Sequence, residues 1–310
     1  MTAETGDRGW GRVLALSFVC IALFPFQPAL LVFVPFGLLA LALPPYRPVT
    51  VAAGLILLAG ALVGIRPEGQ AAIQRGWVLV VGGWFVLAVT LLPRHRFVSR
   101  GLLALAGGLV SVVGFLALRS DALARLDATI SGQLRDTASM TARAAGRLPG
   151  RMGSLTPDMI RQVTEVQVLL YPAMFALATL AGLAVAWWAW GRLAMRPDGS
   201  LAPLRDFRFS DGLVWVLILG LVLVLLPRTP ELATRAGTNL LVFIGALYAL
   251  RGVGVLLFLS GVPGPLGLLL TALAVVLVAP LVMVTTFFVG LFDTWLDIRR
   301  HRPASTGSDA

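Results

Sequence analysis

The sequence of 310 residues contains no lysine, one cysteine and two histidines. Without lysine there is neither the phosphate-binding motif GK[ST] nor a lysine that could form a Schiff base. The lone Cys20 excludes an internal disulfide framework and a multi-cysteine metal site. His95 and His301 lie in arginine-rich connectors and have no partner at ligand spacing. We therefore expect no enzyme activity, no metal centre and no cofactor.

Charge is scarce as well, since charged residues make up 13% of the chain and hydrophobic residues 58%. The mean hydropathy is +0.88. A soluble domain carries about a quarter charged residues and could not bury so much apolar surface in water. The composition predicts an all-α, polytopic integral membrane helix bundle of about eight to ten transmembrane segments, with the lipid bilayer as its main partner.

Apolar runs place the expected helices at 13–25, 28–44, 49–65, 72–93, 101–118, 166–190, 213–227, 236–259 and 264–296. The first two runs form either a tight hairpin or one kinked helix, because Pro25 and Pro28 divide them. The last run is long for one crossing and contains Pro280, so it forms either two short passes or one broken helix. If the C-terminal end lies on the same side as the connector before 213, residues 213–296 must cross an even number of times, which favours two passes divided at Pro280. We divide the chain into N-terminal transmembrane helices (1–118), a polar hairpin (119–165), C-terminal transmembrane helices (166–302) and a disordered tail (303–310).

All 25 basic residues are arginines, and the net charge is +10. They gather between the apolar runs, which indicates membrane orientation and no binding of nucleic acid. Basic connectors at 94–100 and 191–212, together with the basic end of the chain, would all be cytoplasmic under the positive-inside rule. We expect a bacterial inner (cytoplasmic) membrane protein with both termini in the cytoplasm.

The long polar stretch 119–165 has apolar residues at helical spacing in its first half, which predicts an amphipathic helix. Gly146, Pro149 and Gly150 should end that helix. Thr156-Pro157-Asp158 is typical of a helix start, and the new helix should continue into the span that ends at Trp190. This hairpin is either a solvated or membrane-surface element or, less simply, a specific binding site.

Aromatic and basic residues mark two predicted membrane interfaces, and we assign anchoring roles to Trp187, Trp188, Trp190, Trp295, Arg299 and Arg300. Small residues four apart would allow close helix contact, and such sets occur at Gly60 and Gly64 and at Ala178, Gly182 and Ala186.

Arg251 lies inside the apolar run NLLVFIGALYALRGVGVLLFLS (239–260) and is followed by Gly252. A charge within the bilayer costs about 2.5–3.5 kcal/mol, so it usually faces a bundle interior or a cavity. Its partner could be Asp293 or Glu165. Three roles stay open: an ion pair that fixes helix register, a helix break that lets the guanidinium reach the interface, or a ligand or ion site formed by Arg251, Asn239 and Asp293.

Asp293 and Asp297 lie four apart in GLFDTWLDIRR (290–300) and so share one helix face. Two carboxylates there could bind a cation. The alternative is a helix end that passes from the membrane to the cytosol, which we favour for Asp297 because Arg299 and Arg300 follow it.

Three stretches resemble the YybS-like family of predicted bacterial membrane proteins. They are PAMFALATLAGLAVAWWAWGRLAMR (172–196) leading into LAPLRDFRFSDGLVWVLILGLVLVLL (201–226), YALRGVGVLLFL (248–259) after Asn239, and GLFDTWLDIRR (290–300). Arg251 stands where the family often has glutamine. The resemblance covers most of 12–302 and extends, more distantly, to the substrate-binding S components of energy-coupling-factor transporters, which implies capture of a small molecule.

Two functions follow as hypotheses. The first is small-molecule transport or substrate capture of the S-component type, with a cavity lined by Arg251, Asn239 and Asp293 and an unknown ligand. The second is a non-transporting membrane scaffold of the cell envelope, which would bind other membrane subunits through small-residue helix faces and the segment 119–165.

Overall fold

A computed structural model describes residues 28–63, 70–118, 125, 128–132, 135–136, 139–140, 157–195, 201, 203–227, 230–260 and 279–300. Within these residues every regular element is a helix, which confirms the predicted all-α class. The first apolar run, Cys20, the break at 146–153, residues 264–278 and the tail 303–310 lie outside the described residues. Of the predicted amphipathic helix, residues 125, 128–132, 135–136 and 139–140 are described, and all of them are helical.

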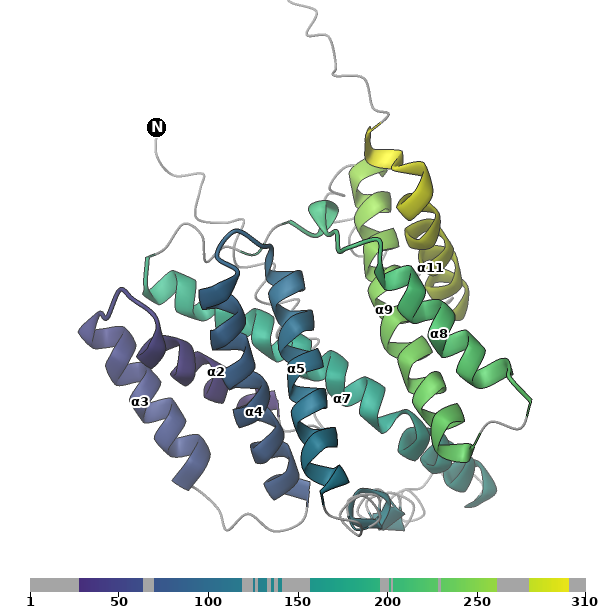
Figure 1. Ribbon diagram of the computed structural model, residues 1–310, viewed down its shortest axis with the longest axis horizontal. Coiled ribbons are helices and arrows are strands. Elements are labelled where there is room, and N and C mark those ends of the chain that lie inside the picture. The colour runs from purple at the N-terminus through teal and green to yellow at the C-terminus, as the bar shows by residue number, and fades with distance from the viewer. Residues whose placement is uncertain are drawn as a thin grey trace, which may run out of the picture. The chain divides into compact units, whose positions relative to one another are not determined.

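The chain forms two compact units that divide between Leu201 and Ala202. The N-terminal unit contains the helices α2 (Pro28–Ala42), α3 (Pro48–Val63), α4 (Gln70–Leu91), α5 (Phe97–Ala117) and α7 (Pro157–Leu193). The helix α7 begins at Pro157 and continues through Trp190, as the sequence predicts. This span, which the sequence places among the C-terminal transmembrane helices, packs against α2, α3, α4 and α5 (Figure 1).

Small residues bring the helices of the N-terminal unit into close contact. A Cβ atom added to Gly182 in α7 would lie 2.7 Å from the carbonyl oxygen of Leu31 in α2. Ala178 and Ala186, four residues to either side, are also buried. The predicted small-residue face of α7 is therefore a helix contact. Gly60 in α3, by contrast, has no atom of the described residues within 4 Å of the position of its Cβ, and Gly64 lies outside the described residues.

Two of the predicted membrane anchors in α7 are core residues. Trp190 is 0% exposed and Trp187 is 4% exposed, whereas Trp188 is only partly buried. Phe85 of α4 packs edge-on against Trp187, with ring centroids 6.1 Å apart. A buried indole cannot reach lipid headgroups, so the structure corrects the predicted anchoring role of Trp187 and Trp190.

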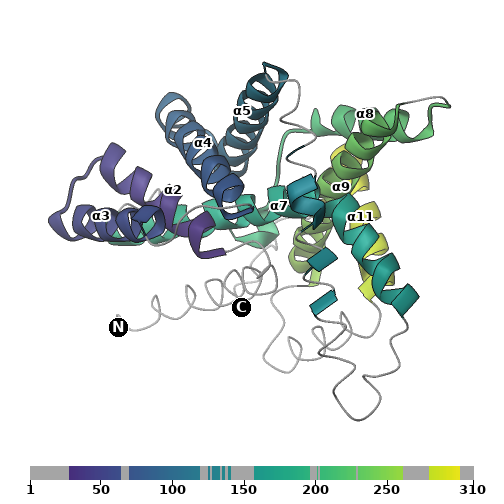
Figure 2. The ribbon, with the colours of Figure 1, turned by 90° about the horizontal axis from the view of Figure 1, so that it is seen from below.

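The C-terminal unit is built around the long helix α9 (Glu231–Ser260). It also contains the short helix η4 (Leu204–Asp206), α8 (Leu213–Leu225), α11 (Ala279–Leu296) and η5 (Ile298–Arg300). Both α8 and α11 pack against α9 (Figure 1, Figure 2). Pro280 lies in the first turn of α11, at the position where the sequence predicted the last apolar run to divide.

The contacts along α9 give the directions of its neighbours. Gly245, Tyr248 and Arg251 face Phe287, Gly290 and Asp293 in that order, so α9 and α11 run parallel. Gly220 of α8 faces Leu241, and Leu223 faces Gly237, so α8 and α9 run antiparallel. The start of α8, the C-terminal part of α9 and the end of α11 therefore lie at the same end of this unit. The basic connector before α8 and the basic residues after α11 share that end, as the predicted even number of crossings requires.

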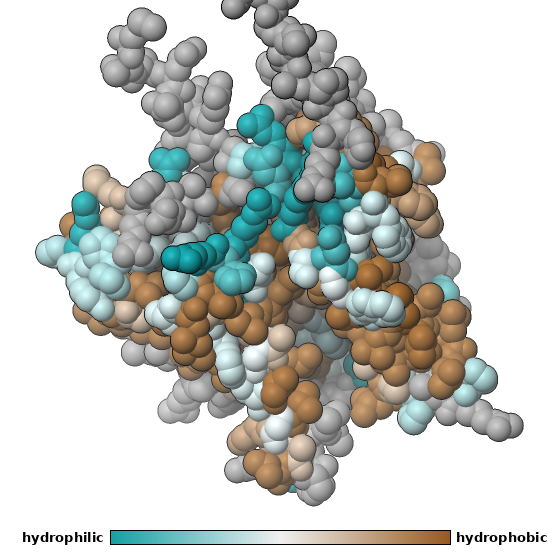
Figure 3. Space-filling view, turned by 45° about the horizontal axis from the view of Figure 1, so that its top comes forward, coloured by the Kyte–Doolittle hydropathy of each residue, from teal (hydrophilic) through white to brown (hydrophobic). Residues whose placement is uncertain are grey.

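Four described helices are long and apolar enough to cross a membrane, namely Ala72–Leu91, Phe97–Ala117, Arg161–Leu193 and Glu231–Leu259. Four further apolar helices are shorter, at Ala29–Ala42, Pro48–Ala61, Leu213–Leu225 and Leu281–Leu296. Hydrophobic side chains cover the flanks of the helices, and hydrophilic side chains gather at the helix ends that come forward in Figure 3. This distribution is what a membrane helix protein requires. The total of eight to ten crossings stays a prediction.

Candidate functional site

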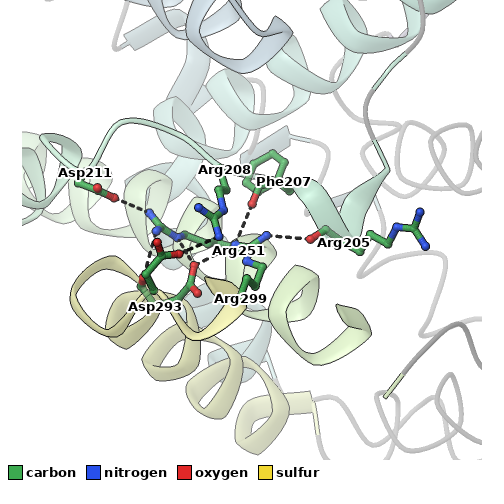
Figure 4. A network of polar contacts seen from close by, with 8 residues as sticks. Arg205, Phe207, Arg208, Asp211, Arg251, Asp293 and Arg299 are labelled. Carbon is green, nitrogen blue, oxygen red and sulfur yellow. Dashed lines mark hydrogen bonds and ion pairs between the residues drawn. The ribbon is translucent and has the colours of Figure 1, made fainter. Parts of the chain in front are cut away.

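Arg251 forms the centre of a network of ion pairs at one end of the C-terminal unit (Figure 4). Its Nε donates to Oδ2 of Asp293 in α11 at 2.9 Å, and its Nη2 donates to the backbone carbonyl of Asp293 at 3.3 Å. Its Nη1 donates to Oδ1 of Asp211, just before α8, at 2.9 Å. The Arg251 side chain is only 4% exposed. The guanidinium therefore links three of the described helices, because it lies on α9, binds Asp293 of α11 and binds Asp211 just before α8.

Two glycines allow α9 and α11 to approach closely enough for the direct pair. A Cβ on Gly252 would overlap the carbonyl oxygen of Thr286, and a Cβ on Gly290 would overlap that of Tyr248. The two backbones are thus in direct contact one residue away from Arg251. Any larger residue at these positions would push the helices apart and lengthen the Arg251–Asp293 contact.

A second arginine binds the same carboxylate oxygen of Asp293. Arg299, just after α11, places Nη2 2.9 Å from Asp293 Oδ2. The same guanidinium donates to the backbone carbonyls of Arg205 at 2.8 Å and Phe207 at 3.2 Å. Because Arg205 and Phe207 belong to the connector that contains η4, Arg299 fastens this connector to the end of α11.

The connector is also held against α9 by a small residue. A Cβ on Gly254 would lie 2.6 Å from the carbonyl oxygen of Leu204, the first residue of η4. Arg208, further along the connector, pairs with Asp297 through Nη2 and Oδ1 at 2.8 Å. Asp297 has φ = 39°, in the left-handed region where Asp, Asn and Gly are tolerated best. This conformation ends α11 and turns the following residues back toward the connector.

Aromatic rings lie beneath the charges. The Arg251 guanidinium carbon is 5.4 Å from the ring centroid of Phe209, a cation–π distance. Phe209 in turn packs edge-on against the fully buried Tyr248, with centroids 5.1 Å apart. The ring of Phe209 and the hydrogen bonds to the carboxylates of Asp211 and Asp293 together fix the orientation of the guanidinium.

The network is balanced in charge. Three arginines (Arg208, Arg251 and Arg299) face three aspartates (Asp211, Asp293 and Asp297). Asp293 has a fully buried side chain, which would be costly to ionise without its two arginine partners. These pairs join the ends of the described helices of this unit, and Oδ1 of Asp293 and Nε of Arg299 are buried with no hydrogen-bond partner in the described structure.

Comparison with known proteins agrees with a membrane protein of this kind. The model of a family of predicted membrane proteins, DUF2232, matches residues 94–294, more than half of the chain. The chain belongs to the DUF2232 family. No curated protein and no solved structure matches it. This match does not extend to the YybS-like family or to the S components, so those two resemblances stay predictions.

The DUF2232 match includes Arg251, Asn239 and Asp293, and the structure brings together two of these three predicted site residues. Asn239 lies twelve positions before Arg251 in α9, about 18 Å along the helix. Its amide donates to the carbonyl of Arg235 one turn earlier, at 2.9 Å. The predicted trio therefore does not converge on one site. Glu165, the other partner considered for Arg251, lies near Arg161 in its own helix at 3.7 Å.

Three members of the network in this DUF2232 protein were not predicted in their observed roles. Arg299 was expected to anchor the chain at the membrane interface, yet its side chain is 5% exposed and holds Asp293 and the connector. Arg208 and Asp211 lie in the basic connector 191–212, and no individual role was predicted for either. The spacing of Asp293 and Asp297, one turn apart, did indicate a polar site at the end of α11. Each carboxylate binds arginine, however, and not a shared cation. Trp295 is 63% exposed, as a membrane anchor should be. Arg300 lies in η5, and its side chain is outside the described part of the chain.

Proposed function

We propose that this DUF2232 protein is a non-enzymatic scaffold of the cell envelope that binds other membrane subunits, and that it does not capture a substrate at Arg251. The observation that carries this proposal is the engagement of Arg251 by Asp293 and Asp211 at 2.9 Å each. A capture site needs a buried charge whose partner is the ligand. Here the protein itself supplies the partners, and Asn239 lies more than three helical turns away.

The helix α8 supports a role in binding another membrane protein. It has 13 residues and spans about 20 Å, less than the roughly 30 Å of a bilayer core. Gly220, its one buried residue, faces Leu241 and the backbone of Gly237 in α9. Large apolar side chains on α8 are exposed, with Trp215 at 71% and Leu225 at 68%. A transmembrane helix of a partner subunit could pack against this surface.

The ionic network would hold α8 in the orientation in which a partner helix could pack against it. Asp211 lies two residues before α8 and binds Arg251, while Arg208 binds Asp297 at the end of α11. Both pairs set the angle at which α8 leaves the connector. A rigid helix presents its apolar face with little loss of conformational entropy on binding, which favours association.

Site-specific photocrosslinking tests the proposal. A benzophenone amino acid is introduced at Trp215 of α8, with Ile56 of α3, which is 70% exposed, as the matched control. We expect a discrete product with one integral membrane protein from position 215 in native membranes, and only lipid adducts from position 56. Lipid adducts alone at both positions would contradict the scaffold role.

The orientation proposed from the sequence remains cytoplasmic for the basic connector at 191–212 and for the C-terminal end. The contacts of Arg299 with the carbonyls of Arg205 and Phe207 support placing residues 203–211 and 297–300 on the same side of the membrane. A bacterial inner membrane is the location that fits the positive-inside rule with arginine-rich ends. Protease protection of a C-terminal tag in spheroplasts tests this orientation, since a cytoplasmic tag survives until the membrane is opened.

Substrate capture is the second candidate, and the exposure of Asp211 favours it. The side chain of Asp211 is 66% exposed, whereas the Arg251 side chain that it binds is 4% exposed. A carboxylate ligand could displace Asp211 and bind Nη1 of Arg251. In that case Asp211→Asn should increase the thermal stabilisation given by amino acids and small dicarboxylates such as succinate. No stabilisation of either wild type or variant would remove this candidate.

A further inference from the structure

The N-terminal unit carries a second group of arginines, at the turn between α4 and α5 and at the end of α7. The guanidinium of Arg100 in α5 donates to the carbonyls of Leu92 and Pro93 in the turn. Its carbon Cζ also lies 5.3 Å from the ring centroid of Trp187 in α7. Arg100 therefore joins the turn to the end of α7, and Figure 1 shows both at the same end of the unit.

Two further arginines flank this junction and are exposed. Arg94 follows Pro93 in the turn, and Arg192 lies in the last turn of α7. Residues 28–63, 70–118 and 166–195, which form the described parts of α2 to α5 and most of α7, contain no Asp or Glu. This end is unlike the network in the C-terminal unit, where each arginine faces a carboxylate. These residues therefore supply no carboxylate that could pair with Arg94 or Arg192.

The apolar surroundings of these arginines identify the kind of anion that fits. Leu91 is 67% exposed beside the turn, and Met195 is 73% exposed just after α7. Arg192 also lies over the ring of Trp188, with Cζ 5.6 Å from the centroid. Exposed aliphatic and aromatic side chains next to arginine at the ends of membrane-spanning helices are typical of the headgroup level of a bilayer.

We propose that Arg94 and Arg192 form a binding site for the headgroup of an anionic phospholipid. The phosphate would lie between the two guanidinium groups, and an acyl chain would lie along Leu91 and Met195. Arginine suits this ligand because its planar fork binds phosphate oxygens in pairs. Arg100 is a positioning residue, since it holds the turn against α7 without facing outward.

Lipid retention measured by native mass spectrometry tests the site. The full-length protein is purified and exchanged into mixed micelles with equal phosphatidylglycerol and phosphatidylcholine. Both lipids carry a phosphate, but choline neutralises it in the second, so the ratio of retained lipids reports selection for net negative charge. A juxtamembrane arginine contributes about fivefold to binding at an anionic surface, which corresponds to ~1 kcal/mol. We expect wild type to retain phosphatidylglycerol preferentially and R94Q/R192Q to lose about tenfold or more of that preference.

Charge-matched variants control the experiment. R135Q/R161Q removes the same charge from two exposed arginines of the unit that lie outside the site, and it should retain the wild-type preference. R94K/R192K keeps the charge and should retain most of it, which separates electrostatic loss from misfolding. An unchanged lipid ratio in R94Q/R192Q, or an equal loss in R135Q/R161Q, would overturn the proposal.

Discussion

Nε of Arg251 in α9 and Oδ2 of Asp293 in α11 lie 2.9 Å apart, at a point where the two parallel helices touch backbone to backbone. Each residue supports the other, because without Asp293 the buried Arg251 would keep only the exposed carboxylate of Asp211, and without Arg251 the buried Asp293 would keep only Arg299. The contact also depends on Gly252 and Gly290, and it extends through Asp211 and Arg299 to the connector before α8. The close glycine contact and the ion pairs thus lie at the same end of the C-terminal unit, and the contribution of each to stability can be tested separately.

The glycine contact predicts a position-specific cost of a single methyl group. Gly252→Ala should destabilise the protein by about 1–3 kcal/mol, because its Cβ would overlap the Thr286 carbonyl and force α9 and α11 apart. Gly245→Ala on the same helix is the matched control, since its Cβ would lie 4.0 Å from Phe287. Thermal unfolding in detergent should show a lower midpoint for the first variant alone. Equal midpoints would mean that the helices are not in contact at Gly252.

The backbone at Asp297 predicts that conformation matters more than charge there. Its pair with Arg208 is partly exposed, so Asp297→Asn should cost less than about 1 kcal/mol. Asp297→Val should cost about 1–2 kcal/mol more, because a β-branched residue resists φ = 39°. Unfolding curves of the two variants separate the contribution of charge from that of backbone conformation. An Asn variant as unstable as the Val variant would show that the charge of Asp297 is what stabilises the protein.

Arg100 predicts that lysine cannot replace arginine in the N-terminal unit. The guanidinium binds two carbonyls and stacks on Trp187 at once, and an ammonium group cannot reproduce that geometry. Arg100→Lys should lower the unfolding midpoint and alter tryptophan fluorescence, whereas Arg94→Lys in the exposed turn should do neither. A neutral effect of Arg100→Lys would show that only its charge is needed.

Much of the helical content could be predicted because apolar runs and proline-marked helix starts are local properties of the sequence. Pro157 and Pro280 lie at helix starts in the structure for that reason. The burial of Trp187 and Trp190 could not be predicted, because lipid and protein interior are both apolar. Hydropathy therefore does not tell which face of a membrane helix meets other helices.

The Arg251–Asp293 pair was one of few possible pairings, because a charge inside an apolar run has few partners available. The roles of Arg299 and Asp211 depend instead on the path of residues 203–211 over α9. That path is set by carbonyl contacts and by the close approach of Leu204 to Gly254, and no residue-type pattern encodes it. The sequence therefore predicted Arg251 and Asp293 as possible partners, but it did not predict the contacts of Arg299 and Asp211.

A double-mutant cycle on Arg251 and Asp293 tests the central claim that the network is a structural clamp. We expect Arg251→Gln and Asp293→Asn each to destabilise the protein strongly, by about 3–5 kcal/mol, because each leaves a buried charge with a missing partner. The double variant should be clearly more stable than the sum of the two losses implies, with a coupling above about 1 kcal/mol in equilibrium unfolding. Additive losses, or single variants as stable as wild type, would contradict the claim.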